Sequence, residues 1–269
     1  MIDATLSANT APAYPREAML SSVIVVLPAY NEQQHIAALL DNIDDTLQRQ
    51  RIRYHVVVVD DGSIDGTLPA VESYQDRVPV SLHRHEFNQG LGRTIRDGLR
   101  IASEIASDQD IVITMDADET HIPGLIPRML EMVYEGRDVV IASRYQPGAC
   151  VVGVSLLRRV LSYGASVLFR AVFPTRGVRD FTCGFRAYRA SVLRRAVASY
   201  GDNFVESDGF ACMAEILLTL RGMGAIFGEV PIVLRYDFKQ GGSKMRIAKT
   251  IRQSISVLLR HRFSAMRKN

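Results

Sequence analysis

The first half of the chain alternates short apolar runs with longer stretches of helical periodicity. The apolar runs are rich in β-branched residues, which predicts strands buried on both faces, as in a parallel sheet. Apolar positions at helical spacing, such as Ile36, Leu39, Leu40, Ile43 and Leu47, predict amphipathic helices between the strands. The runs lie at 23–27, 55–59, 78–82 and 139–143 and in a central stretch, 111–118, and helices are expected at about 32–50, 67–75, 92–106 and 124–135.

This alternation predicts an α/β fold: a Rossmann-like, mostly parallel central sheet flanked by helices, with right-handed crossovers. After about residue 145 the pattern changes. Residues 151–173 are largely apolar but contain Arg158, Arg159 and Arg170. Three arginines are too costly for an ordinary membrane span, so we expect a helical hairpin or an interfacial helix. Farther along, we expect a strand or loop at 181–189, a helix at 209–222, a strand at 225–235 and a basic amphipathic helix at 244–263.

Composition places the chain among globular proteins of a reducing compartment. Its 269 residues suffice for one large α/β domain or two small ones. The three cysteines are far apart and lack C-x-x-C spacing, which argues against a disulfide framework or a zinc site. Residues 1–20 have neither the basic start nor the apolar core of a secretory signal, so they predict a disordered lead-in. We expect a catalytic domain at 21–240 and a closing loop with a basic helix at 241–269.

Positive charge is concentrated at the C-terminal end. Residues 244–269 carry a net charge of +8, whereas the whole chain carries +3, so the remainder carries −5. A basic amphipathic helix favours peripheral binding to an anionic, cytoplasmic membrane face. The alternative is a helix that packs on the sheet or in a dimer, with solvated charges. Nucleic acid is a poor third partner, because few aromatic residues are interleaved with the basic ones.

Acidic residues follow three of the predicted strands. Asp116 and Asp118 end the central stretch, and residues two apart on a strand point the same way. Both carboxylates can then reach one Mg²⁺ or Mn²⁺ ion, often shared with substrate phosphates. A solvated, helix-capping Asp-x-Asp loop is the alternative. Ligands bind outside the carboxyl ends of parallel strands, where these acids are expected.

Two further loops leave strands in the same way. The segment 28–32 offers Tyr30 to flank a base and Glu32 to accept from ribose or base donors. Asp60 and Asp61 offer acceptors for a base imide or ribose hydroxyl, and the alternative for both loops is turn and cap chemistry. Acids at three neighbouring strand ends favour one shared site. A dinucleotide-binding fingerprint is absent after the first strand.

Seven motifs together resemble the family 2 glycosyltransferases with the GT-A fold, and most of all the dolichyl- or polyprenyl-phosphate mannose and glucose synthases. They keep the order of that family over about 220 residues of the chain. The motifs are PAYNE (28–32), VVVVDDGSIDGT (56–67), NQGLGRTIRDGL (88–99), TMDAD (114–118), ASRY (142–145), FTCGFRAYR (181–189) and GGSKM (241–245).

The resemblance implies a nucleotide-sugar donor, of the GDP-mannose or UDP-glucose type, and Mg²⁺ or Mn²⁺. It implies that Pro28, Tyr30, Glu32 and Asp60 or Asp61 contact base and ribose. It implies donor diphosphate and metal contacts at Asp116, Ala117 and Asp118, acceptor phosphate contacts at Arg144, Arg158 and Ser162, and a loop with Lys239, Ser243 and Lys244 that closes over the donor. Catalytic roles fall on Asp118, Arg144 and Lys244.

Two departures from the family pattern matter. The family often has a glutamine two residues after the second aspartate, where this chain has Thr120. The lipid-linked enzymes often carry C-terminal membrane spans, and none is expected here. His121 is expected to be a surface turn residue.

The expected reaction is inverting transfer of a hexose to a polyprenyl or dolichyl phosphate at the membrane surface. An ionised lipid phosphate needs no general base, whereas a hydroxyl acceptor needs a carboxylate such as Asp180 or Asp208. A soluble glycosyltransferase acting on a glycan or small molecule stays open, as does a non-catalytic nucleotide-sugar-binding subunit. A homodimer and a separate membrane partner subunit also stay open.

Overall fold

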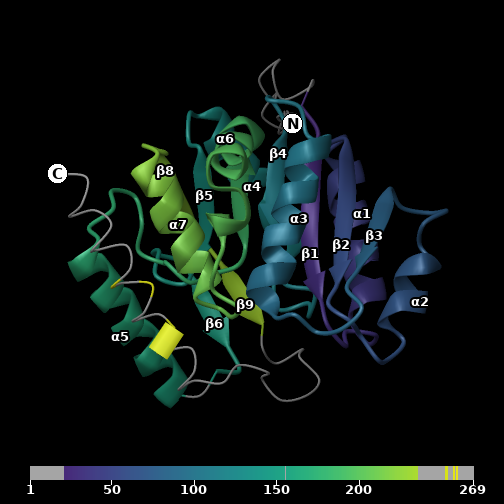
Figure 1. Cartoon of the computed structure of the whole chain (residues 1–269), viewed down its shortest axis with the longest axis horizontal. Coiled ribbons are helices and arrows are strands. Elements are labelled where there is room, and N and C mark those ends of the chain that lie inside the picture. The colour runs from purple at the N-terminus through teal and green to yellow at the C-terminus, as the bar shows by residue number, and fades with distance from the viewer. Residues whose placement is uncertain (1–20, 155, 236–251, 254–256, 258, 260–269) are drawn as a thin grey trace, which may run out of the picture.

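The computed structural model describes residues 21–154 and 156–235, together with 252, 253, 257 and 259; the side chains of 156–158 are not described. A seven-stranded sheet, in the order β3-β2-β1-β4-β7-β5-β8, forms the centre of the molecule (Figure 1). Its strands are β1 (Val23–Ala29), β2 (Tyr54–Asp60), β3 (Val80–Arg84), β4 (Ile111–Thr114), β5 (Val139–Ser143), β7 (Arg186–Arg189) and β8 (Phe227–Pro231). The short strands β6 (Cys150–Val152) and β9 (Val233–Arg235) pair in parallel beside it.

The sheet is parallel except for β7, which runs antiparallel between β4 and β5. The expected α/β fold with a mostly parallel sheet is therefore confirmed. Its centre is apolar on both faces: β1, β2, β4 and β5 bury almost every side chain, as their unbroken β-branched runs predict.

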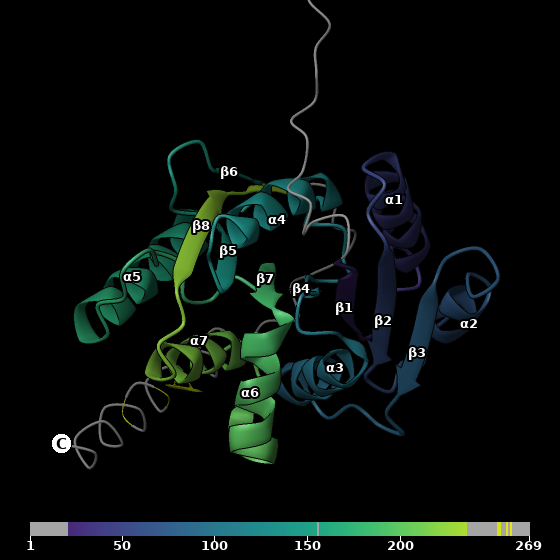
Figure 2. The same cartoon turned by 90° about the horizontal axis from the view of Figure 1, so that it is seen from above.

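Helices cover both faces of the sheet (Figure 2). α1 and α4 lie on one face, and α3, α6 and α7 lie on the other. The helices are α1 (Ile36–Arg49), α2 (Thr67–Glu72), α3 (Leu91–Ile105), α4 (Ile126–Tyr134), α5 (Leu156–Val172), α6 (Ala190–Tyr200) and α7 (Cys212–Gly222), with 3₁₀ turns at Pro123–Leu125 and Gly201–Phe204.

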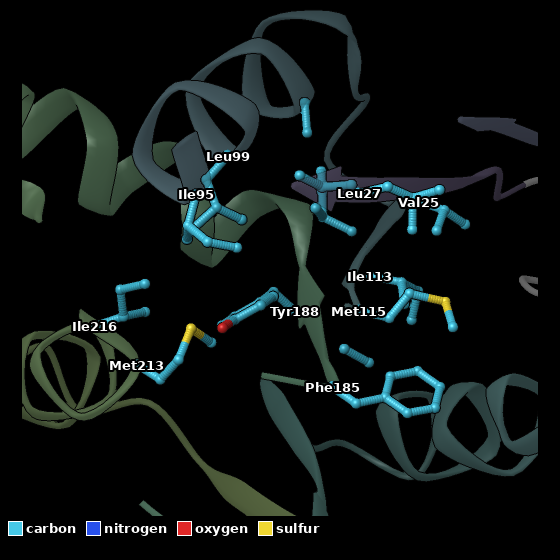
Figure 3. Close-up of a cluster of buried hydrophobic side chains, with 14 of the residues drawn as sticks. Val25, Leu27, Ile95, Leu99, Ile113, Met115, Phe185, Tyr188, Met213 and Ile216 are labelled. Carbon is cyan, nitrogen blue, oxygen red and sulfur yellow. The ribbon is translucent and has the colours of Figure 1, made fainter. Parts of the chain in front are cut away.

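The core beneath the site joins strands β1, β4 and β7 to helices α3 and α7. Side chains from all five elements gather there (Figure 3). Phe185, which is fully buried, points toward Met115 at the end of β4. The loop that carries Asp116 and Asp118 therefore begins on a packed base.

Several expectations need correction. β1 continues through Pro28 to Ala29 instead of ending at Leu27. β1 pairs with β4 only as far as Thr114, so at Pro28 no ladder hydrogen bond is lost on that side. The 181–189 segment contains the antiparallel strand β7, and α6 follows it, although no helix is expected there from the sequence.

The 151–173 segment contains one helix, α5, after strand β6, so the hairpin alternative is wrong. None of the helices in the described residues is both long and apolar enough to cross a membrane. The lead-in 1–20 and almost all of the closing loop and basic helix lie outside the described residues. Within that helix, Val257 is fully buried in the core, whereas Arg252 and Leu259 are exposed.

Candidate active site

Three acid-bearing loops leave neighbouring strands at the same edge of the sheet. They follow β2, β1 and β4, which are adjacent and parallel. Because parallel strands end at one edge, the loops after Asp60, Ala29 and Thr114 share one rim. This is the arrangement that the sequence predicts for a shared site.

The loops after β1 and β2 are bonded to each other. The Asn31 amide donates to Ser63 Oγ at 2.9 Å, and the Glu32 amide donates to Thr67 Oγ1 at 2.7 Å. Asn31 has a left-handed backbone, with φ of 54°, a conformation that is uncommon outside glycine and often found at functional sites. These bonds hold Tyr30 and Glu32, both half-buried, at the rim.

Asp60 and Asp61 are adjacent but have different surroundings. The Asp61 carboxylate accepts the amides of Gln89 and Gly90, at 2.8 and 2.9 Å, and lies 2.8 Å from His85 Nδ1. Asp60 is fully buried and accepts the Ser63 amide through Oδ2, while its Oδ1 has no hydrogen-bond partner in the described chain. Asp61 therefore fixes the loop at 88–90, and Asp60 retains an acceptor for a ligand.

The loop after β4 folds around its carboxylates. Asp118, largely buried, accepts the Thr120 hydroxyl at 2.6 Å and the Thr120 amide at 3.2 Å through Oδ1. The Asp116 side chain keeps 35% of its exposure, and Ala117 turns its methyl group into the core. Glu119 has a left-handed φ of 56° and lies 3.2 Å from His35 Nδ1, which links this loop to the start of α1.

Asp116 and Asp118 suit a hard divalent cation by their chemistry. Among the described residues, no group of three or more His, Cys, Asp or Glu side chains is arranged to hold a metal ion. Mg²⁺ and Mn²⁺ bound with a nucleotide often take one or two carboxylates and complete their shell with phosphates and water. Gly184 keeps the space beside Asp116 open, because a Cβ there would lie 3.0 Å from Asp116 Oδ1. Two oxygen donors with open space fit such an ion.

Arg144, at the end of β5, is held by a buried carboxylate. Its Nε and Nη2 donate to the two oxygens of Asp180, at 2.8 and 2.7 Å, and Nη2 also donates to Thr182 at 2.6 Å. Asp180 is fully buried, and the Arg144 side chain keeps 20% of its exposure. Glu229 on β8 accepts the amides of residues 179 and 180, which holds the Asp180 backbone in place.

This ion pair changes the pKa of both partners. Burial alone would lower the pKa of Arg144 and raise that of Asp180, but their mutual attraction and hydrogen bonds win. The pKa of Arg144 is raised well above its usual range, and that of Asp180 is lowered. Arg144 is thus a permanent cation, and Asp180 is a poor proton acceptor.

The remaining predicted residues are placed only in part. Ser162 on α5 shares a hydrogen bond of 2.8 Å with the Tyr145 hydroxyl, next to Arg144. Lys239, Ser243 and Lys244 lie outside the described residues, as does the side chain of Arg158. Their expected roles stay predictions.

Three histidines contribute more than the sequence indicates. His121 is 4% exposed, accepts the Asp116 amide at 3.0 Å and stacks on Phe185, so the expected surface position is wrong. His35 joins the loops after β1 and β4. His85 lies between Asp61 and Asp97, 3.2 Å from the latter. The available signal was their position beside motif residues, but histidine alone does not distinguish a buried partner from an exposed one.

The fold places the chain in a known structural class. Glucosyl-3-phosphoglycerate synthase from Mycobacterium tuberculosis, crystallised with Mn²⁺, UDP and glucosyl-3-phosphoglycerate, superposes with a TM-score of 0.65 at 21% identity. The match covers 91% of this chain and 81% of that one. The described fold is therefore that of the GT-A glycosyltransferases.

The sequence narrows the class to one family. The model of glycosyl transferase family 2 matches residues 24–197, so the chain belongs to glycosyl transferase family 2. The expected family and enzyme class are thereby confirmed.

Three named relatives are similar over most of this chain. The dolichol-phosphate mannosyltransferase of Pyrococcus furiosus is 32% identical over 246 residues, 91% of this chain, which spans only 64% of that protein. The polyprenol monophosphomannose synthase of Mycolicibacterium smegmatis is 31% identical over 86% of this chain and 83% of its own length. The undecaprenyl-phosphate mannosyltransferase of Micrococcus luteus is 32% identical, over 83% and 87%.

Proposed function

We propose that this protein transfers a hexose from a nucleotide sugar to a polyprenyl phosphate, with inversion, in the presence of Mg²⁺ or Mn²⁺. The observation that carries the proposal is the Asp116–Asp118 pair at the shared rim, in a chain whose named relatives act on lipid phosphates. The relatives favour mannose as the sugar, and the sequence resemblance allows GDP-mannose or UDP-glucose as the donor.

The donor would occupy the rim formed by the loops after β2, β1 and β4. Asp60, with its buried unpartnered Oδ1, would accept a hydrogen bond from a base imide N–H, and Tyr30 would flank the base. Asp116 and Asp118 would hold the cation against the diphosphate. When bound, the cation offsets the negative charge that develops on the departing nucleoside diphosphate.

The acceptor side supports an anionic acceptor. Arg144 is a fixed cation at the end of β5, near Ser162, and is oriented by Asp180. A phosphate oxygen is already ionised near neutral pH, so its attack on the anomeric carbon requires no general base. A hydroxyl acceptor would need one, and of the two candidate bases, Asp180 and Asp208, the first is already paired with Arg144.

The exposed apolar residues of helix α5 favour contact with a membrane surface. One side of it exposes the apolar residues Val160, Leu161, Tyr163, Val167 and Leu168, which can insert into the headgroup region. Leu168→Gln, at a residue 46% exposed, should reduce co-sedimentation with vesicles containing phosphatidylglycerol. Ile226→Gln, at a residue 50% exposed just before β8 and outside α5, is the matched control. Equal pelleting of both variants and the unchanged protein would remove α5 from the membrane contact.

One assay tests the proposed reaction. The protein is incubated with GDP-mannose or UDP-glucose and Mn²⁺, with and without a short polyprenyl phosphate, and glycolipid is measured. We expect a glycolipid that requires both the lipid phosphate and the metal. Consumption of donor only with a hydroxyl acceptor would replace the proposal with a soluble glycosyltransferase. Donor binding without consumption would replace it with a non-catalytic subunit.

A further inference from the structure

His121 lies against the backbone and the carboxylate of Asp116. It is buried, with 4% exposure, in the turn that follows β4. Its Nδ1 accepts the backbone amide of Asp116 at 3.0 Å, and its Nε2 lies 3.9 Å from Asp116 Oδ2. One side chain thus faces two parts of the same aspartate.

The amide contact fixes the ring chemistry. A backbone N–H can only donate, so the ring nitrogen facing it must present a lone pair. The ring hydrogen is then on Nε2, on the side of the Asp116 carboxylate. At 3.9 Å the Nε2–Oδ2 separation is longer than a hydrogen bond, so His121 holds Asp116 directly through the backbone amide and only faces its carboxylate.

Gly184, in the segment before β7, lies beside Asp116 Oδ1. Thr114 Oγ1 donates to the Gly184 carbonyl at 2.7 Å, which fixes this backbone, and a Cβ added at Gly184 would lie 3.0 Å from Asp116 Oδ1. The next residue, Phe185, stacks on His121 with a ring separation of 5.2 Å. The His121 ring therefore has little freedom to move away from Asp116.

We propose that His121 is a positioning residue, which holds Asp116 in the conformation in which it shares a divalent cation with Asp118. The inference rests on the proposed function, since it assumes that the pair binds a metal ion with the donor. Asp118 has its own support in Thr120, so the two carboxylates are aimed by different side chains. Loss of His121 should release Asp116 alone and weaken the binding of the cation.

The test compares three substitutions of His121, two of which, to asparagine and to leucine, are similar in size. His121→Asn keeps an acceptor for the Asp116 amide and a donor for its carboxylate, whereas His121→Leu keeps neither. His121→Phe retains the ring that stacks on Phe185, and His83→Phe, at an exposed histidine of β3, is the control. Mn²⁺ is titrated by electron paramagnetic resonance with saturating GDP or UDP, and melting temperatures establish that each variant is folded.

We expect His121→Leu and His121→Phe to bind Mn²⁺ about 10- to 100-fold more weakly, the usual effect of removing an outer-shell partner. His121→Asn should bind more tightly than either, and His83→Phe should match the unchanged protein. Either apolar variant that folds suffices, and unchanged Mn²⁺ binding in it would overturn the inference. Equal weakening in His121→Asn would also overturn it, because ring volume would then be what matters. Absence of Mn²⁺ binding in the unchanged protein would instead refute the metal-dependent function.

Discussion

Asp180 and the Asp116–Asp118 pair differ in what compensates the charge of their carboxylates. Asp180 is fully buried, and both its oxygens accept from the Arg144 guanidinium. Asp116 keeps 35% of its side-chain exposure, and Asp118 is supported by the Thr120 hydroxyl. Asp180 receives its cation from the protein. The Asp116–Asp118 pair instead receives hydrogen bonds or contacts from neutral neighbours, His121 and Thr120.

The difference separates a carboxylate that orients a cation of the protein from a pair that can bind a metal ion. A buried carboxylate with its own arginine has no need of a further cation, and removing one partner leaves a costly unpaired charge. A carboxylate pair held by orienting groups can take a cation that arrives with a ligand. The same sheet edge thus has a fixed cation, Arg144, after β5 and the Asp116–Asp118 pair after β4. We call these two aspartates the receptive pair.

The largest expected effect comes from the receptive pair. Asp118→Asn retains an oxygen that can accept from Thr120, so the free energy of unfolding should change by less than about 1 kcal/mol. The loss of a charged metal ligand should lower kcat by about 10³-fold or more, since a catalytic metal contributes several kcal/mol. Radiolabelled transfer to polyprenyl phosphate and a urea unfolding curve check the two values. Activity within tenfold of normal would remove Asp118 from the metal site.

Asp180→Asn should show the opposite balance. It leaves the Arg144 guanidinium without its carboxylate, and we expect a loss of about 3 kcal/mol in unfolding free energy, at the low end for a broken buried pair. Because folding lowers the pKa of Asp180 below its ordinary value of 3.8, the contribution of this pair is complete above that value. It is lost as the pH falls through the lower, folded pKa.

Urea unfolding at several pH values provides the check. The difference in unfolding free energy between the unchanged protein and Asp180→Asn should be constant from pH 6 to 8 and shrink only below about pH 4. A difference that grew toward acid pH would contradict the assignment of Asp180 as an ionised partner. A folded Asp180→Asn protein should still bind a cation at Asp116 and Asp118, because Asp180 does not contribute to that pair.

A third prediction applies the same distinction to neighbours in sequence. Asp61→Asn weakens charge-assisted bonds to two amides and His85 and should cost about 2 kcal/mol of stability. Asp60→Asn, at a buried oxygen without a partner, should leave stability unchanged or improved. Its GDP or UDP affinity should fall about tenfold, a loss of about 1.4 kcal/mol. Calorimetric titration and thermal unfolding of both variants check this, and the reverse pattern would exchange the two roles.

The sequence is sufficient to predict the receptive pair and the rim on which it lies. Asp116 and Asp118 end an unbroken apolar run, and parallel strands bring their ends together, so periodicity and residue type lead to the site. Their support is harder to predict. His121 lies in the turn after β4, where the sequence predicts a surface residue, and only the structure shows that it is buried against Phe185.

The Arg144–Asp180 ion pair depends on contacts between distant segments of the chain. Arg144 and Asp180 are 36 positions apart and meet because β7 enters the sheet antiparallel between β4 and β5. Hydrophobic periodicity and motif spacing do not predict this insertion of β7, because a strand of four residues cannot be distinguished from a loop in the sequence. Pro28 is similar: a proline usually ends a strand, and only the short length of β4 makes it acceptable in β1.

The smallest expected effect is a change in thiol reactivity near Asp180, measured at the three cysteines. Burial raises the pKa of the Cys183 and Cys212 thiols to about 12, whereas Cys150 is exposed on β6. Since the thiolate is the reactive form, a thiol reagent at pH 8 should modify Cys150 quickly and the other two slowly. Cys183 also donates its amide to Asp180, so Asp180→Asn should speed the labelling of Cys183 and leave Cys212 unchanged. Mass spectrometry of the labelled peptides measures each rate. Equal acceleration at both buried thiols would mean that the whole domain opens, and that the Asp180 network is not a local unit.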